Sequence, residues 1–180
     1  MSMIRIAGIV KESIVDGPGL RYVVFAQGCP HHCKGCHNEA ALDFAGGQEY
    51  ETEKIIMDIE KNPLLAGVTF SGGEPFSQPE AFFELAAKLK EKNMNIVTFS
   101  GYTYEELVTL SDENDAIRGL LDLTDILIDG RFVLEKRDLT QKFKGSSNQR
   151  YIDMNGTRVQ GTLVVLDGSE GLASRAICHL

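Results

Sequence analysis

The 180-residue sequence lacks any run of lysine and arginine, and its formal net charge is −8 at pH 7. An acidic chain without such a run is a poor candidate for binding nucleic acids or anionic membranes. No apolar stretch is long enough to span a bilayer, and residues 1–5 lack the apolar core of a signal peptide. These absences predict a cytoplasmic protein.

The sequence also has no internal repeat, low-complexity segment or linker, and its length fits a single domain over residues 1–180. Cysteine is scarce, with four residues in all, but three of them, Cys29, Cys33 and Cys36, stand close together. This clustering suits a metal or cluster site in a reducing compartment better than a disulfide framework.

Short apolar, β-branched runs alternate with helical patterns along the chain. Strands are expected at residues 4–10, 22–27, 67–70, 95–99 and 126–128, and helices at 52–61, 79–92, 104–110 and 112–121. This alternation predicts βαβ units and an α/β fold with a mostly parallel sheet. Because a complete eight-unit barrel needs roughly 200 residues or more, we expect an open or partial (β/α) barrel, with its ligands at the C-terminal ends of the strands.

Several helix starts and one turn can be predicted from local signals. The expected helix caps are Thr52 and the capping-box pairs Ser77–Glu80 and Thr103–Glu106. Asn155 and Gly156, between short runs at residues 151–153 and 158–160, predict a hairpin turn.

The three clustered cysteines follow the pattern Cys29-x3-Cys33-x2-Cys36. Three thiolates on a cluster of four irons leave one iron without a protein ligand, and an open coordination position is where chemistry occurs. Two other interpretations stay open at this point. Residues 33–37 match the c-type haem attachment pattern, which leaves Cys29 unexplained. A structural zinc ion would take the cysteines with one of the nearby histidines, His31, His32 or His37.

The cysteine spacing, with a histidine directly after the last cysteine, resembles the radical S-adenosylmethionine (SAM) superfamily. In that family three cysteines bind a 4Fe–4S cluster, and the amino and carboxylate groups of SAM chelate the fourth iron. One electron then cleaves SAM to methionine and a 5′-deoxyadenosyl radical. The resemblance implies that Cys29, Cys33 and Cys36 bind the cluster and that His37 is a cofactor-binding residue. Gly35, before the last cysteine, is a minor departure from the family pattern.

A second motif, Ser71-Gly72-Gly73-Glu74-Pro75, follows a predicted strand. By itself a Gly-Gly turn is usually only a turn. Two glycines let the backbone approach a ligand closely, and a carboxylate such as that of Glu74 can bind an ammonium group. The motif resembles the Gly-Gly-Glu motif of the same superfamily, which implies that Gly72, Gly73 and Glu74 orient the methionine end of SAM.

The N-terminal motif Asp16-Gly17-Pro18-Gly19 with Arg21 resembles the signature of glycyl-radical-enzyme activases, although a Gly-Pro turn entering a strand would look the same. Residues 129–132 and 143–150 further resemble the activating proteins of anaerobic ribonucleoside-triphosphate reductase. The resemblance extends over residues 13–153. Pyruvate formate-lyase activases are similar but longer.

Some residues have roles that rest on the resemblance alone. Asp129 and Arg131 stand where related activases place an acidic and a basic residue beside SAM, but a surface turn and a surface ion pair are the alternatives. Cys178 is expected to be a free thiol, because a fourth protein ligand would close the open iron. Partner docking, SAM contacts and loop structure all remain open for Ser146, Asn148 and Arg150.

The resemblance implies an enzyme that removes a hydrogen atom from a glycine of anaerobic ribonucleoside-triphosphate reductase, with no side chain acting as general acid or base. It also implies an electron donor such as flavodoxin, and a homodimer or a hetero-oligomer with the reductase. The alternative substrate is another glycyl-radical enzyme such as pyruvate formate-lyase. The alternatives of another class are an iron–sulfur electron carrier, which has no need of the motif at residues 71–74, and a zinc-binding module, which would be colourless.

Overall fold

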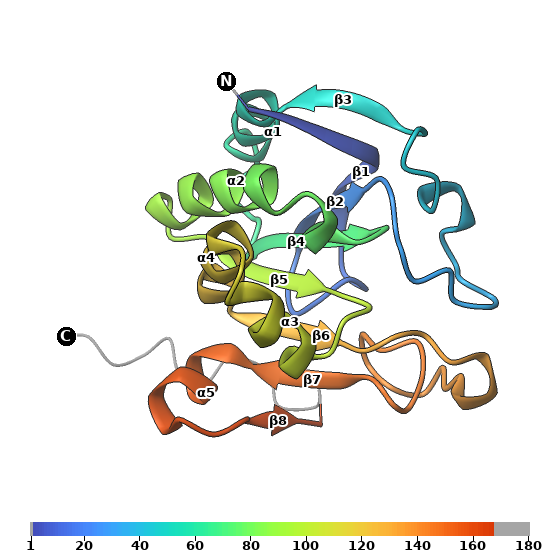
Figure 1. Cartoon of the computed structure of the whole chain (residues 1–180). Coiled ribbons are helices and arrows are strands. Elements are labelled where there is room, and N and C mark those ends of the chain that lie inside the picture. Colours follow the sequence, from blue (N-terminus) through green and yellow to red (C-terminus); the bar gives the residue numbers. More distant parts are fainter. Residues whose placement is uncertain (1, 168–180) are drawn as a thin grey trace.

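The computed structural model describes residues 2–167, and its eight strands form one sheet with α1 to α4 on one face (Figure 1). The strands are β1 (Met3–Ser13), β2 (Arg21–Ala26), β3 (Gln48–Glu51), β4 (Gly67–Gly72), β5 (Asn95–Phe99), β6 (Ile126–Asp129), β7 (Arg150–Asp153) and β8 (Val165–Leu166). The α-helices are α1 (Thr52–Ile59), α2 (Pro79–Glu91), α3 (Tyr104–Ser111), α4 (Asp115–Leu123) and α5 (Met154–Gln160), and the short 3-10 helices are η1 (Glu39–Ala41), η2 (Pro75–Ser77) and η3 (Leu134–Lys136).

The sheet is mixed, with the strand order β3-β1-β2-β4-β5-β6-β7-β8. The central strands β2, β4, β5 and β6 are parallel, whereas β3 and β1 on one side and β7 and β8 on the other are antiparallel to their neighbours. The prediction of a mostly parallel sheet is therefore right for the centre and wrong for both edges. Parallel neighbours need a crossover of a dozen or more residues, and α1 to α4 supply such crossovers only between β2 and β6.

Two apolar clusters lie on opposite faces of the sheet. The larger cluster packs the sheet against α1, α2, α3 and α4, and includes Phe82, Leu85 and Leu89 of α2. The smaller cluster contains Val97, Ile126, Ile128 and Tyr151. Side chains alternate between the faces of a strand, so Leu127 joins the larger cluster while its two neighbours join the smaller one. The helix-free face of the central strands is therefore also apolar.

Helix caps agree with the sequence at one of the three expected positions. The capping box of Thr103 and Glu106 is present at the start of α3, with both of its hydrogen bonds. Thr52 is the first residue of α1 rather than its cap, and its hydroxyl donates to the carbonyl of Ser2. The prediction of a capping box at Ser77 and Glu80 is wrong, because Ser77 ends η2 and α2 begins after Gln78 without a side-chain cap.

The hairpin predicted at Asn155 and Gly156 is also wrong. These residues lie inside α5, which follows β7 directly. The side chain of Asp153 accepts a hydrogen bond from the Gly156 N–H, and its backbone carbonyl accepts one from the Thr157 hydroxyl. Aspartate is a favoured N-cap residue, and here this cap outweighs the turn preference of the Asn-Gly pair.

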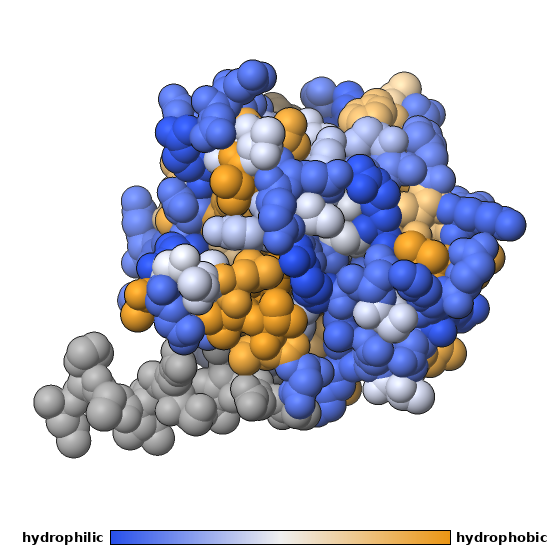
Figure 2. Space-filling model, turned by 60° about the horizontal axis from the view of Figure 1, so that its bottom comes forward, coloured by the Kyte–Doolittle hydropathy of each residue, from blue (hydrophilic) through white to orange (hydrophobic). Residues whose placement is uncertain are grey.

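The surface seen from the side of β7 and β8 is mostly hydrophilic, with one large apolar area and several smaller ones (Figure 2). In residues 2–167, no helix is long and apolar enough to cross a membrane. Among the large apolar residues that are well exposed, Val15 and Leu139 also line the cavity described below.

Candidate cluster and cofactor site

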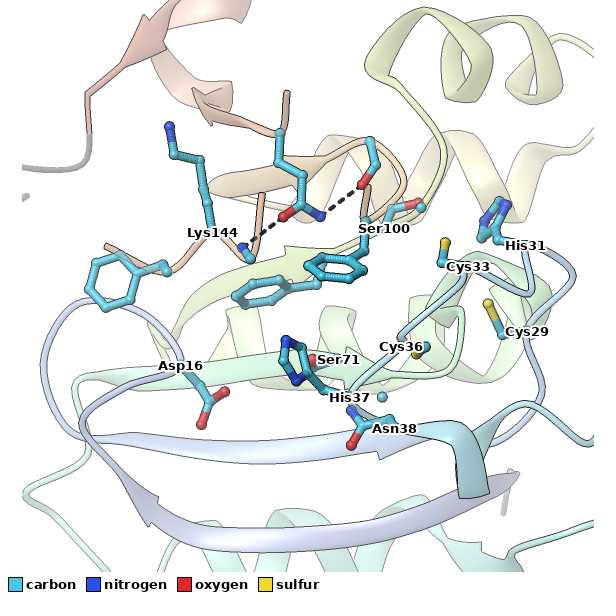
Figure 3. A pocket seen from close by; sticks show the side chains of 18 of the residues that line it. Asp16, Cys29, His31, Cys33, Cys36, His37, Asn38, Ser71, Ser100 and Lys144 are labelled. Atoms are coloured by element: carbon cyan, nitrogen blue, oxygen red, sulfur yellow. Dashed lines mark hydrogen bonds between the residues drawn. The ribbon is translucent and has the colours of Figure 1, made fainter. Parts of the chain in front are cut away.

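A cavity of about 580 Å³ lies where the loops after the four parallel strands meet, a volume typical of small-molecule sites. The loops after β2, β4, β5 and β6 all contribute to its lining, so they meet at one edge of the sheet. Figure 3 shows Cys29 and Cys33 beside His31 at one end of the cavity, and Asp16 and Lys144 at the other.

The loop after β2 brings all three motif cysteines to this cavity. Cys29 is buried, and Cys33 and Cys36 are partly exposed. The backbone N–H of Cys29 donates to the Leu42 carbonyl at 3.1 Å, and that of Cys36 donates to the Cys33 carbonyl at 3.2 Å. Burial raises the pKa of the Cys29 thiol, and the backbone N–H of His31 opposes this by lowering it.

The three thiols of the motif fit the ligand set of a four-iron cluster. In the described part of the chain, no three His, Cys, Asp or Glu side chains converge as ligands of one metal ion. Three thiolates of a four-iron cluster each bind a different iron, so they need to share a cavity but not a single point. Cys29, Cys33 and Cys36 meet this requirement, since each lines the same cavity.

The motif at residues 71–74 packs directly against the loop after β2, residues 27–47, here called the cysteine loop. Gly72 has a φ of 95°, and a Cβ added there would lie 2.6 Å from the backbone nitrogen of Ala26. A Cβ on Gly73 would lie 2.4 Å from the carbonyl oxygen of Gly28. Both glycines line the cavity, so their missing side chains let two loops come together and leave backbone facing the ligand space.

Glu74 does not line the cavity, and its side chain is fully buried behind the cavity wall. Its carboxylate accepts hydrogen bonds from the backbone N–H groups of Phe76 and Gly101 and from the Ser100 hydroxyl. The imidazole Nε2 of His31 lies 2.9 Å from the same carboxylate. Sequence reasoning placed Glu74 against SAM and did not identify His31, Ser100 and Gly101 as its partners, because these three come from loops that are distant in sequence.

Of the other residues predicted to bind the cofactor, the structure places one at the cavity and two away from it. His37 lines the cavity, and its ring centroid lies 5.3 Å from that of Phe132. Asp129 and Arg131 do not line it. Asp129 is buried and accepts from Arg150 at 2.5 Å and from the Tyr104 N–H at 2.7 Å. Arg131 forms an ion pair on the surface with Glu106.

One wall of the cavity is the segment between β6 and β7, residues 130–149, here called the wall segment. Ser146 is fully buried, and its hydroxyl accepts from the Val133 N–H. Gln149 joins the two ends of the segment, because its side chain accepts from the Gly145 N–H and donates to the Gly130 carbonyl. Asn148 donates to the Arg131 carbonyl. For Ser146 and Asn148 these contacts establish a role in loop structure.

Arg150, the first residue of β7, follows the wall segment and links this part of the chain to α3 through Glu105. Two hydrogen bonds from its guanidinium lower the pKa of Glu105 from 4.5 to about 2. A carboxylate whose pKa is lowered by folding stabilises the protein above its ordinary pKa, and this contribution disappears as the pH falls through the folded-state value.

We therefore expect Glu105→Gln to lower the free energy of unfolding at pH 7, by less than about 1 kcal/mol because the side chain is 62% exposed. The difference from the wild type should shrink between pH 4.5 and pH 2. Urea unfolding at several pH values measures it, with Glu135→Gln at an exposed residue as the control. A difference that stays constant down to pH 2 would contradict the ion pair.

The loop between β1 and β2 closes the cavity at the end opposite His31. Val15 and Asp16 line the cavity. The Asp16 carboxylate accepts from the Ser13 hydroxyl at 2.5 Å, and its backbone carbonyl accepts from the Thr69 hydroxyl at 2.7 Å. These contacts hold an acidic side chain at the cavity, where the N-terminal motif of the sequence predicted a functional loop.

The sequence is similar to several proteins of known type. An anaerobic ribonucleoside-triphosphate reductase-activating protein from Vibrio cholerae is 34% identical over 76% of this chain and 89% of that protein. One from Escherichia coli is 31% identical over 76% of this chain and 90% of its own length. A pyruvate formate-lyase-activating enzyme from Clostridium pasteurianum is 36% identical over 72% of this chain but only 56% of its own length.

One solved structure, QueE from Escherichia coli, aligns with 56% of this chain and 53% of its own at 15% identity, and its TM-score of 0.46 is too low to support an argument. A family model described as a 4Fe-4S single cluster domain matches residues 15–152 and so spans the cavity and all three motif cysteines. The chain therefore belongs to this 4Fe–4S family and, within it, to the anaerobic ribonucleoside-triphosphate reductase-activating proteins.

Proposed function

We propose that this protein is a radical SAM activase that removes a hydrogen atom from a glycine of anaerobic ribonucleoside-triphosphate reductase. The observation that carries the proposal is the position of Cys29, Cys33 and Cys36 on one cavity at the C-terminal ends of the parallel strands, next to the Gly72–Gly73 backbone. The family membership supports the same reaction.

In this proposal, Cys29, Cys33 and Cys36 hold a 4Fe–4S cluster as thiolates. When bound, the cluster supplies one electron to SAM, which breaks into methionine and a deoxyadenosyl radical that takes the glycine hydrogen. The protein binds and orients the reactants. Gly72 and Gly73 present backbone to the methionine end of SAM, and His37 lies on the same cavity. Glu74 supports this wall from behind.

Exclusion of water is the other task of the chain, because a carbon radical attacks whatever lies within reach. Phe99, Phe132 and Phe143 line the cavity. Their rings give it an apolar lining. Asp129 and Arg131 stay outside the proposed contacts with SAM, because their side chains pair with Arg150 and Glu106.

We further propose that residues 1–180 form one radical SAM domain with an open barrel. All eight strands of residues 2–167 belong to a single sheet, and the central four are parallel. A barrel that stays open on one side would admit a loop of the partner protein to the cavity. An electron donor such as flavodoxin, a homodimer or a complex with the reductase, and a cytoplasmic location remain predictions from the sequence.

A second substrate is favoured by a specific observation. The pyruvate formate-lyase-activating enzyme of Clostridium pasteurianum is 36% identical to this chain, which is slightly higher than the identity to the reductase-activating proteins cited above. That relative is longer, since the match covers only 56% of it. We therefore propose pyruvate formate-lyase as the second candidate substrate, after the reductase.

Electron paramagnetic resonance distinguishes the two substrates. The reconstituted protein is incubated without oxygen with SAM, a reductant and either the reductase or pyruvate formate-lyase. We expect a glycyl doublet on the reductase and none on the lyase. A doublet only on the lyase would replace the proposed substrate, and SAM cleavage without a cluster, or zinc in place of iron, would overturn the reaction itself.

A further inference from the structure

His31 stands between Cys29 and Cys33 in the cysteine loop, and its side chain is only 4% exposed. Its Nε2 atom lies 2.9 Å from a carboxylate oxygen of Glu74, whose side chain is fully buried. Such a contact forms when Nε2 carries its hydrogen and donates it to the carboxylate. This contact connects the loop after β2 with the loop after β4.

The surroundings of the His31 ring are built to hold it in this position. A Cβ added to Gly101 would lie 2.2 Å from the ring, so this site requires a glycine. The ring of Tyr102 contacts it edge-on, with centroids 4.4 Å apart. The loop after β5 thus encloses the imidazole from a second side.

Glu74 has no free position for another donor of comparable quality. One of its oxygens accepts from Phe76 N–H at 3.1 Å and Ser100 Oγ at 3.0 Å. The other accepts from Gly101 N–H at 2.8 Å, Ser100 Oγ at 3.1 Å and His31 Nε2 at 2.9 Å. A carboxylate offers about four acceptor sites, and these donors fill them. The Glu74 carboxylate therefore binds protein rather than the ammonium group of a ligand in the cavity.

We propose that His31 and Glu74 are a positioning pair that locks the cysteine loop onto the loops after β4 and β5, and thereby keeps Cys29 and Cys33 in place for the cluster. The hydrogen bond between His31 and Glu74, at 2.9 Å, joins these loops directly, and the Glu74 N–H adds a second link by donating to the Gly28 carbonyl. The inference rests on the cluster assignment in the proposed function, but not on the identity of the protein substrate.

The test uses three amide variants that differ in reach. Glutamine at position 31 places its NH₂ group where Nε2 of histidine lies, whereas asparagine is one methylene too short. His32 is exposed and has a φ of 48°, a conformation that asparagine tolerates, so His32→Asn is a control in the same loop. The expected order is that His31→Asn loosens the loop, while His31→Gln and His32→Asn resemble the wild type.

Two measurements follow the loop, and the first needs no cluster. Amide hydrogen exchange of the metal-free protein reports the Cys29, Cys36 and Glu74 amides, which are hydrogen-bonded in the structure. We expect exchange in His31→Asn to be about tenfold faster, the factor that corresponds to about 1.4 kcal/mol. Iron and sulfide per chain after reconstitution should fall in the same variant only.

The outcomes separate this inference from the proposed function. Equal amide exchange and equal iron content in His31→Asn and His31→Gln would overturn the positioning pair. Exchange in His32→Asn that is as fast as in His31→Asn, with as little iron bound, would overturn it too. If exchange is faster in His31→Asn but its iron content is unchanged, the pair does not contribute to holding the cluster. If the wild type itself takes up no iron, the proposed function fails, but the exchange experiment still tests the pair. A Glu74→Gln variant that weakens SAM binding alone would return Glu74 to the role expected from the motif.

Discussion

Replacing Cys33 by alanine is expected to abolish both iron uptake as a 4Fe–4S cluster and reductive cleavage of SAM. Cys33 is partly exposed on the cavity, and with Cys29 and Cys36 it provides the three thiols there. With three thiolate ligands, one iron of the cluster is already without a protein ligand. Removing Cys33 leaves a second iron without one, so that only two thiolates hold the cluster and it is expected to dissociate. The corresponding changes at Cys29 and Cys36 should have the same effect.

The matched control is Cys178→Ala. Cys178 lies outside residues 2–167, and the sequence predicts a free thiol there. We expect this variant to keep the iron, sulfide and visible absorbance of the wild type after anaerobic reconstitution. If it loses iron as completely as Cys33→Ala does, the cluster has four protein ligands and no open iron, and the proposed reaction is wrong.

Replacing Arg21 by methionine is expected to have the largest effect on stability. The side chain is 1% exposed, and burial lowers its pKa from 12.5 to about 10, so it is still charged at neutral pH. Its guanidinium donates to the carbonyls of Pro18, Val68 and Asn95 and to the hydroxyl of Thr69. These bonds fasten the loop that carries Asp16 to β4 and β5.

Methionine fills much of the same space but donates nothing, which leaves several buried acceptors unsatisfied. A hydrogen bond from a charged group contributes about 1.5–3 kcal/mol, and an unsatisfied buried group costs about 1–3 kcal/mol. After allowing for the desolvation of the guanidinium, we expect a loss of about 3 kcal/mol or more in the free energy of unfolding. For a chain of this size that corresponds to a fall in Tm of roughly 6–12 °C.

Denaturant unfolding of the metal-free protein measures this effect without any contribution from the cluster. Arg137→Met, at an exposed arginine, should change the free energy by no more than about 0.5 kcal/mol. Arg21→Lys should be intermediate, because an ammonium keeps the charge but cannot reach all four acceptors. An Arg21→Met variant as stable as Arg137→Met would show that the buried hydrogen bonds contribute little.

Much of the central fold was predictable from local patterns. The expected strands at residues 95–99 and 126–128 agree with β5 and β6 to within one residue, and the capping box at Thr103 is present. These predictions hold because strand alternation and helix capping depend on residues that are neighbours in the chain. The edges of the sheet were not predictable in this way, since the direction of β1 and β7 depends on pairing with strands elsewhere.

The Asn155–Gly156 pair illustrates a failure of local reasoning. The same dipeptide suits a hairpin turn or the first turn of a capped helix, and Asp153 decides between them. The short strand β8 then pairs with β7 after the helix, not directly across a turn. The turn preference of the Asn155–Gly156 pair was outweighed by the Asp153 cap two residues earlier and by the pairing of β7 with β8.

The sequence by itself determined the ligand chemistry of this protein, because three closely spaced cysteines and a Gly-Gly turn after a strand fix which atoms are available. Only the tertiary structure decided what the charged residues do. Glu74, Asp129 and Arg131 are joined to His31, Arg150 and Glu106, each of which lies at least 21 positions away in the chain. A buried or paired charge takes its role from its partner, and such partners are brought together only when the sheet has formed.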